Sequence, residues 1–293
     1  MADISIEIMQ RHQWDEVATL IHDSTNAWYQ QNRGHLIFPA GAASTRLFCE
    51  VYESLDPGCC LIGVSDDDGT IVGSCFYHPR ETHFSLGIMN VHPRAFGRGV
   101  ARSLLQRVID LAEAEQKPVR LVSSAMNLDS FSVYTKAGFV PRKTYQDMIL
   151  EVPEEGIEAT HPLPGQIRDA TTDDVSAMGD LEQAVAHIRR EKDYRFFINA
   201  GAADTNRDTL GDWHTSVLCH GDDVQGWIVS VTHPGSSMIG PCIARDQETA
   251  TALLLNELNY RVAKTMVFLV PVDCNRIVKA AYSWQARNCE LHV

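Results

Sequence analysis

Apolar residues recur along the first half of the chain in two patterns, which predict strands and helices. Patterns typical of strands lie at residues 4–9, 59–65, 70–78, 84–91, 119–125 and 139–150. Patterns typical of amphipathic helices lie at residues 13–31, 41–54, 97–116 and 128–137. A hairpin followed by a strand–helix–strand crossover predicts an α/β fold of the α+β type. Its single β-sheet would be mixed, with parallel and antiparallel strands, and would carry helices on both faces.

A similar pattern starts again in the second half. Residues 167–182 repeat the short strand and amphipathic helix of residues 6–22. In the middle of each half, residues 60–79 and 216–234 place two apolar stretches around a tight turn with Asp and Gly, and both end in His-Pro. This arrangement predicts one hairpin in each half.

An Asn and a Tyr recur with the same spacing in the last third of each half. Asn127 stands seven residues before Tyr134, and Asn275 stands seven residues before Tyr282. Three matching features in the same order predict a tandem duplication.

A polar segment separates the two halves. Residues 154–166 are rich in Pro, Gly and Glu and lack apolar periodicity, which is typical of an interdomain linker. We therefore predict two domains, residues 1–153 and residues 167–293, each of an ordinary size. The second half ends soon after its counterpart of the 128–137 helix, so its sheet is expected to be a strand short or to be completed differently.

Composition narrows the classes of partner and the compartment. The net charge of −13 disfavours nucleic acid and anionic membranes as main partners and favours a cationic substrate that bears an amine. The eight cysteines lack the paired spacing of a zinc site, which predicts reduced thiols and no metal. No stretch has the ~18 apolar residues of a membrane span, so we expect a cytoplasmic protein.

The run from Phe84 to Leu105 carries the strongest chemical signal. An apolar strand enters a loop with Arg94, Gly97 and Gly99, and an apolar-periodic helix follows. Amides at a helix start lack internal acceptors and carry partial positive charge, and glycine lets a phosphate approach them. Together with Arg98 and Arg102, this loop suits the pyrophosphate of a nucleotide-like cofactor. The alternative is a tight turn with solvated arginines; the chain lacks the Rossmann and Walker patterns.

This run resembles the acetyl-CoA-binding motif of the GNAT superfamily of N-acetyltransferases. The matching residues are Arg94-x-x-Gly97-x-Gly99-x-Ala101, followed at the family's spacing by Asn127, Tyr134 and Gly138-Phe139. The resemblance implies a domain over residues 1–153 that uses acetyl-CoA as acyl donor. It also implies transfer of the acetyl group to an amine of a small molecule or a peptide, and it leaves a homodimer open.

The resemblance assigns roles to individual residues. The pyrophosphate would be held by the Arg94 side chain and by the backbone amides of Phe96, Gly97, Arg98, Gly99, Val100 and Ala101. Met89 and Val91 would pair with the amides of pantetheine. Tyr134 would protonate the departing thiolate, although it could instead be a buried aromatic with a satisfied hydroxyl. Asn127 would cap the following helix or bond the pantetheine arm, and Asp129 is an alternative cap.

The general base is the open question. Residues 82–91 contain no Asp or Glu, which leaves His83, Glu81 and His78 as candidates, each of which could equally be an ordinary loop residue. The missing carboxylate favours a rival hypothesis, a CoA-binding sensor or scaffold without catalysis.

The second half lacks glycines that correspond to Gly97 and Gly99. Its corresponding turn has none, and Asp246 and Glu248 at the helix start would repel a pyrophosphate. We therefore predict a degenerate GNAT-like repeat that keeps the fold and does not bind CoA.

Overall fold

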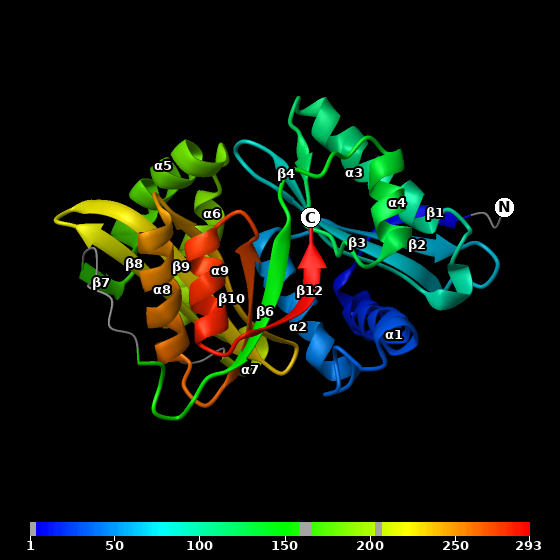
Figure 1. The fold of residues 1–293 in the computed structure, drawn as a ribbon. Helices are drawn as coiled ribbons and strands as arrows, with labels where there is room; N and C mark the ends of the chain where they lie inside the picture. Colours follow the sequence, from blue (N-terminus) through cyan, green and yellow to red (C-terminus); the bar gives the residue numbers. More distant parts are fainter. Residues whose placement is uncertain (1–3, 159–165, 203–206) are drawn as a thin grey trace. The chain divides into compact units, whose positions relative to one another are not determined.

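The computed structural model describes residues 4–158, 166–202 and 207–293 (Figure 1). The chain divides into two compact units, unit 1 (Met1–Leu121) and unit 2 (Val122–Val293). Within the described ranges, no helix is both long enough and apolar enough to cross a membrane. Part of the predicted linker, residues 159–165, lies outside the described residues.

Unit 1 contains a five-stranded sheet in the order β1-β2-β3-β4-β5. Its strands are β1 (Ile4–Ile8), β2 (Cys60–Ser65), β3 (Ile71–Pro79), β4 (Phe84–Val91) and β5 (Val119–Arg120). The first four strands pair antiparallel and β5 pairs parallel with β4, so the sheet is mixed as predicted. Its helices are α1 (Trp14–Arg33), α2 (Ala42–Leu55) and α3 (Val100–Ala114), with short 3₁₀ turns η1 (Arg11–Gln13) and η2 (Pro93–Ala95).

Opposite faces of the unit 1 sheet pack against different helices. Val17 and Ile21 of α1 share a buried core with Ile62 and Phe76. On the other face, a Cβ at Gly73 would lie only 2.5 Å from Cγ1 of Val100. Because a larger residue would push α3 away, Gly73 fixes the start of that helix close to the sheet.

Unit 2 contains a seven-stranded sheet in the order β12-β6-β11-β10-β9-β8-β7. Its strands are β6 (Tyr145–Glu151), β7 (Gln166–Asp169), β8 (Asp212–His220), β9 (Asp223–His233), β10 (Ser236–Ala244), β11 (Thr265–Pro271) and β12 (Arg287–His292). Its helices are η3 (Thr172–Asp174), α4 (Leu128–Lys136), α5 (Val175–Ala186), α6 (Glu191–Ala202), α7 (Arg207–Leu210), α8 (Gln247–Tyr260) and α9 (Asn275–Ser283). The β8–β9 hairpin and its counterpart β2–β3 confirm the predicted hairpin in each half.

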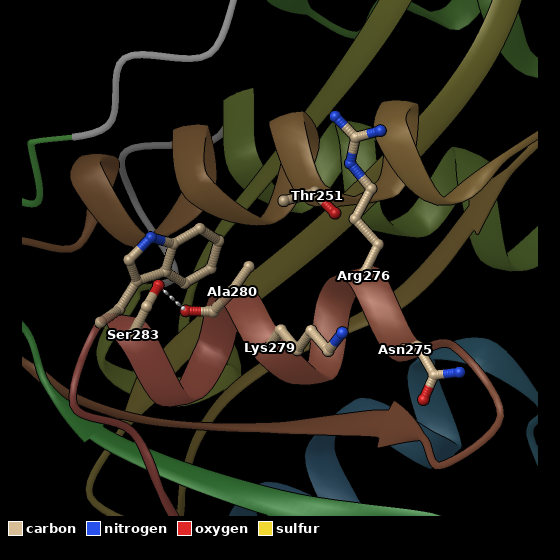
Figure 2. A pocket seen from close by; sticks show the side chains of 7 residues that line it. Thr251, Asn275, Arg276, Lys279, Ala280 and Ser283 are labelled. Atoms are coloured by element: carbon tan, nitrogen blue, oxygen red, sulfur yellow. Dashed lines mark hydrogen bonds between the residues drawn. The ribbon is translucent and has the colours of Figure 1, made fainter.

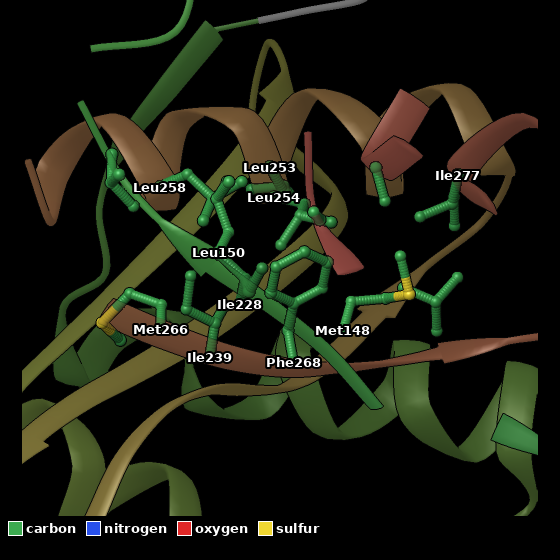
Figure 3. Packing of buried hydrophobic residues seen from close by; sticks show 14 of the residues in the cluster. Met148, Leu150, Ile228, Ile239, Leu253, Leu254, Leu258, Met266, Phe268 and Ile277 are labelled. Atoms are coloured by element: carbon green, nitrogen blue, oxygen red, sulfur yellow. The ribbon is translucent and has the colours of Figure 1, made fainter. Parts of the chain in front are cut away.

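β6 does not pair with the strands of unit 1, as two separate repeats over residues 1–153 and 167–293 would require. This strand follows α4 in the first half of the sequence, yet it pairs antiparallel with β11 and with β12. Met148 and Leu150 of β6 are buried among residues of the second half, including Phe268 of β11 and Leu253 of α8 (Figure 3). The second sheet is therefore not a strand short: β6 and its own last strand, β12, complete it.

Because of this pairing, the division between the compact units falls after Leu121, earlier in the chain than the predicted linker at residues 154–166. Pairing and core contacts define the units, whereas the limits 1–153 and 167–293 describe the sequence repeat and stay a prediction.

Three predicted elements are shorter in the structure. The helix predicted over residues 97–116 begins at Val100, because Gly97 and Gly99 have φ of +75° and +89°, outside the helical region. The strand predicted over residues 119–125 contains β5 and then a separate bridge between Ser124 and His292. The strand predicted over residues 139–150 begins only at Tyr145.

A partly buried histidine in unit 2, His214, should make stability depend on pH. Nδ1 of His214 lies 2.8 Å from Oε1 of Glu257, and Nε2 lies 3.2 Å from Oδ1 of Asp169. Burial alone would lower the pKa of His214, but the hydrogen bonds and charges of Glu257 and Asp169 outweigh it and raise the pKa above its ordinary value of 6.5.

Folding thus favours the protonated ring, and this stabilisation is fully present below about pH 6.5 and is lost as pH rises through the folded-state pKa. In urea unfolding at pH 5.5, 7.0 and 8.5, the free-energy difference between the wild type and His214→Gln should shrink as pH rises. The exposed His220→Gln variant should show no such trend. A difference that grows with pH would contradict this assignment.

Candidate active site

The glycine loop of unit 1 connects β4 to α3. β4 leads through η2 into the loop, and Gly99 is the residue that precedes α3. Both Gly97 and Gly99 adopt left-handed φ, and a Cβ at either position would meet no atom within 4 Å. The left-handed φ therefore favours glycine at both positions, and the described residues leave the space within 4 Å of each Cβ position empty.

Several backbone amides in this loop are available to a ligand. Within the described part of the chain, no protein group accepts a hydrogen bond from the amides of Gly97, Gly99, Val100, Ala101 and Arg102. The amide of Phe96 instead donates to the Pro93 carbonyl at 3.2 Å, and the amide of Arg98 donates to Ala95 at 3.3 Å. The amides at Gly97 and Gly99 and at the start of α3 thus form an anion-binding turn, which we call the cradle.

The arginines around the cradle differ in their partners. The Arg94 side chain donates to the Thr70 hydroxyl and lies 3.9 Å from Oδ2 of Asp68, both in the β2–β3 turn. Arg98 and Arg102 are exposed and form no ion pair within the described residues. Arg98 and Arg102 are therefore the cations with uncompensated charge beside the cradle, while Arg94 is already held across the loop.

One edge of β4 is left without a strand partner near the cradle. β4 pairs with β3 along its length, but it pairs with β5 only at Phe84 and Ser85. The amide of His92 donates to Val72 of β3 at 2.9 Å. Because antiparallel strands alternate, the backbone groups of Met89 and Val91 point away from β3 toward the unpaired edge. That edge can pair with an extended chain that carries amide groups.

A bulge interrupts β4 just before these residues. Cys75 pairs with Met89 and Tyr77 pairs with Leu86, so Gly87 and Ile88 together oppose Phe76. A Cβ on Gly87 would lie 3.0 Å from Nε2 of His78 and from Cβ of Phe76. The bulge therefore turns the strand at a point where a histidine approaches its backbone.

The three candidates for the base have different surroundings. His83 is buried, and its two ring nitrogens lie 3.1 Å from the Thr82 hydroxyl and 2.9 Å from the Ser85 hydroxyl. Glu81 is exposed in the turn between β3 and β4. His78 is buried on β3, and its Nδ1 lies 2.7 Å from Oδ2 of Asp56. The structure thus gives His83 hydroxyl partners and His78 a carboxylate.

Asn127 and Tyr134 belong to unit 2. Oδ1 of Asn127 accepts a hydrogen bond from the Ser130 amide at 3.1 Å, so Asn127, and not Asp129, caps α4. The ring of Tyr134 is half-buried and packs edge-on against Phe139, with ring centroids 6.0 Å apart. The local geometry of α4 is thus fixed by its cap and by this aromatic pair.

The amino-acid sequence of the chain was compared with known protein families and with individual proteins. Residues 18–139 match the Acetyltransferase (GNAT) family. The chain contains a GNAT-family acetyltransferase domain. A stretch of 88 residues is also 33% identical to the UPF0157 protein YqkA of Bacillus subtilis (strain 168). That stretch is 29% of this chain and 25% of YqkA, so the match spans about a quarter of the relative's length.

Solved structures resemble nearly the whole chain. A putative acetyltransferase from Pyrococcus horikoshii matches with a TM-score of 0.73 at 14% identity, over 100% of this chain and 90% of that one. A tandem GNAT protein from the clavulanic acid biosynthesis pathway matches with a TM-score of 0.63 at 14% identity, over 99% and 97% of the two chains. A GCN5-related N-acetyltransferase from Sphaerobacter thermophilus matches with a TM-score of 0.58 at 18% identity, over 99% and 94%. The chain has the tandem GNAT fold.

In the second GNAT repeat, the start of α8 differs from the start of α3 because a side chain of the protein caps it. Oδ1 of Asp246 accepts the Thr249 amide at 2.8 Å, and this hydrogen bond is the main cause of the lowered pKa of Asp246. A cleft of about 580 Å³ lies between α8 and α9, and Figure 2 shows its lining side chains. One of them, Arg276, lies 3.4 Å from Glu248. The start of α8 is thus capped by the chain's own carboxylate, where unit 1 leaves amides free.

Asp56 and Arg80, which lie beside His78, could not be predicted from local sequence patterns. Asp56 follows α2, and it accepts hydrogen bonds from both Nη1 and Nη2 of Arg80, at 3.0 and 2.8 Å. His78 was a candidate because it lies close to residues 82–91 in the sequence, but no local pattern links it to Asp56, which follows another element.

Proposed function

We propose that the chain is an N-acetyltransferase that transfers an acetyl group from acetyl-CoA to an amine of a small molecule or a peptide. The cradle is the observation that carries this proposal, because its free amides and the Arg98 and Arg102 side chains suit a pyrophosphate. The net charge of −13 supports a cationic amine as acceptor, in preference to nucleic acid or an anionic membrane, and the protein would act in the cytoplasm.

Each part of the site would contribute one step. Bound acetyl-CoA would supply the acetyl group as a thioester. The free edge of β4 at Met89 and Val91 would align the pantetheine amides, which orients the thioester for attack. Tyr134 would donate its phenolic proton to the departing sulfur.

The alternative function is a CoA-binding sensor or scaffold. β4 carries no Asp or Glu, so the strand itself offers no carboxylate to take the amine proton. A sensor would keep the cradle and bind acetyl-CoA without turnover.

The decisive experiment is calorimetric titration of acetyl-CoA into the wild type and Gly99→Glu. Glutamate at φ of +89° would strain the turn by about 1–2 kcal/mol and would place a negative charge in the cradle. We expect at least about tenfold weaker binding. A matched control is Gly221→Glu, which also has positive φ and open space but lies in the β8–β9 turn.

Release of free thiol with a panel of amines then separates the two functions. Saturable binding with thiol release supports the enzyme, and binding without release on any amine supports the sensor. Equal affinity in wild type and Gly99→Glu, or no binding to either, would overturn the cradle as the site. Because Asp246 caps α8, we expect a stoichiometry of one acetyl-CoA per chain.

A further inference from the structure

A buried ion-pair network lies on the face of the unit 1 sheet that packs against α1 and α2. His78 projects from β3 and is 7% exposed, Asp56 is 5% exposed and Arg80 is 5% exposed. Asp56 binds Arg80 through both carboxylate oxygens, and it also contacts Nδ1 of His78 at 2.7 Å. Both oxygens of the Asp56 carboxylate already accept guanidinium hydrogen bonds, and the carboxylate also acts as the acceptor toward the imidazole.

This arrangement fixes the tautomer of His78. Since Asp56 accepts, Nδ1 must carry the proton, and the lone pair of the neutral ring lies on Nε2. Within the described residues, Nε2 has no hydrogen-bond partner. A buried imidazole nitrogen with a free lone pair is a proton acceptor that the fold has left unused.

Nε2 faces β4 at the bulge. It lies 3.0 Å from the point that a Cβ on Gly87 would occupy, so only glycine keeps this space clear. If the phosphates bind at the start of α3 and pantetheine runs back along Val91 and Met89, the thioester arrives near this bulge. The open nitrogen and the reactive end of the donor then meet at the same segment of β4.

Other ionisable groups around the ring do not compete for this role. Tyr52 of α2 packs edge-on against His78, with ring centroids 4.6 Å apart. Glu53 of α2 accepts the Gly58 amide, and its pKa is raised mainly by burial. β4 itself has no ionisable side chain, and Asp56 contacts both His78 and Arg80.

We propose that His78, oriented by Asp56 and Arg80, is the general base of the transfer; this rests on the proposed function. As the amine nitrogen bonds to the thioester carbon, its proton passes to Nε2 of His78, directly or through one water. The carbon–sulfur bond breaks, and the sulfur takes the proton of Tyr134. The imidazolium then returns its proton to solvent, and the Tyr134 phenolate takes a proton from solvent, so both groups are restored. β4 has no carboxylate of its own, and Asp56 at the end of α2 instead acts by orienting His78.

The test compares His78→Gln with the wild type over pH 5.5–9.5. Gln can still donate to Asp56 but cannot take a proton, so kcat should fall by about 10²–10⁴-fold, and the acid limb of the kcat/KM profile should disappear. Calorimetric affinity for acetyl-CoA should stay within about threefold. Circular dichroism and urea unfolding verify that the variant is folded.

A second variant retains the side chains of His78, Asp56 and Arg80. Gly87→Ala places a methyl group in front of Nε2 and should also lower kcat, while the acid limb of its residual activity persists. An acid limb that persists in His78→Gln, or that disappears in His83→Gln instead, would overturn the assignment to His78. Absence of thiol release from the wild type would overturn the proposed function itself, so the two failures are distinguishable.

Discussion

Tyr134→Phe should slow thiol release from acetyl-CoA by about 10²–10⁴-fold and leave the affinity for acetyl-CoA within about threefold. Phenylalanine keeps the ring and its edge-on contact with Phe139, so α4 should fold as in the wild type. What is lost is the hydroxyl proton, which the departing thiolate would otherwise receive. The expected signature is therefore a fall in kcat with little change in binding.

The tandem repeat offers a matched control for this prediction. Tyr282 lies on α9 at the corresponding position of the second repeat, and it is 45% exposed. Tyr282→Phe removes the same hydroxyl where no cradle exists, so it should leave turnover unchanged. Equal rates for Tyr134→Phe and the wild type would show that Tyr134 serves packing and that another group protonates the sulfur.

A fragment of residues 167–293 should fail to fold cooperatively, whereas residues 122–293 should fold. The shorter fragment lacks β6, which pairs on one side with β11 and on the other with β12. It also loses Met148, Leu150 and Val152 from the buried core. Truncating one such side chain typically costs about 2–5 kcal/mol, and a whole domain is stable by only about 5–15 kcal/mol.

Urea unfolding followed by circular dichroism measures this difference. Addition of a synthetic peptide of residues 143–155 should restore a cooperative transition to the shorter fragment, because the missing strand can pair with the edge of β11. A cooperative transition of residues 167–293 alone, with the same midpoint as residues 122–293, would show that β6 contributes nothing to the stability of the second sheet.

Most elements and the cradle could be predicted from the sequence because their signals are local. Apolar periodicity placed α1, α2 and both hairpins close to their observed limits. The glycine pair at residues 97 and 99 predicted a loop that enters a helix, and the structure has both, although the predicted helix over residues 97–116 included the two glycines. The amides that remain free follow from the helix start itself, which any sequence with that turn would share.

Only the tertiary structure decided which strands pair and which charges meet. An alternating strand such as β6 can pair with any suitable edge, so its place between β11 and β12 depends on contacts more than a hundred residues apart in the chain. The network of Asp56, His78 and Arg80 could not be predicted from the sequence either, because its residues come from different elements. β4 itself carries no carboxylate, whereas packing brings one from the end of α2 to a histidine on β3. Local sequence thus determined the elements and the cradle, and long-range packing decided the pairing of β6 and the buried network beside β4.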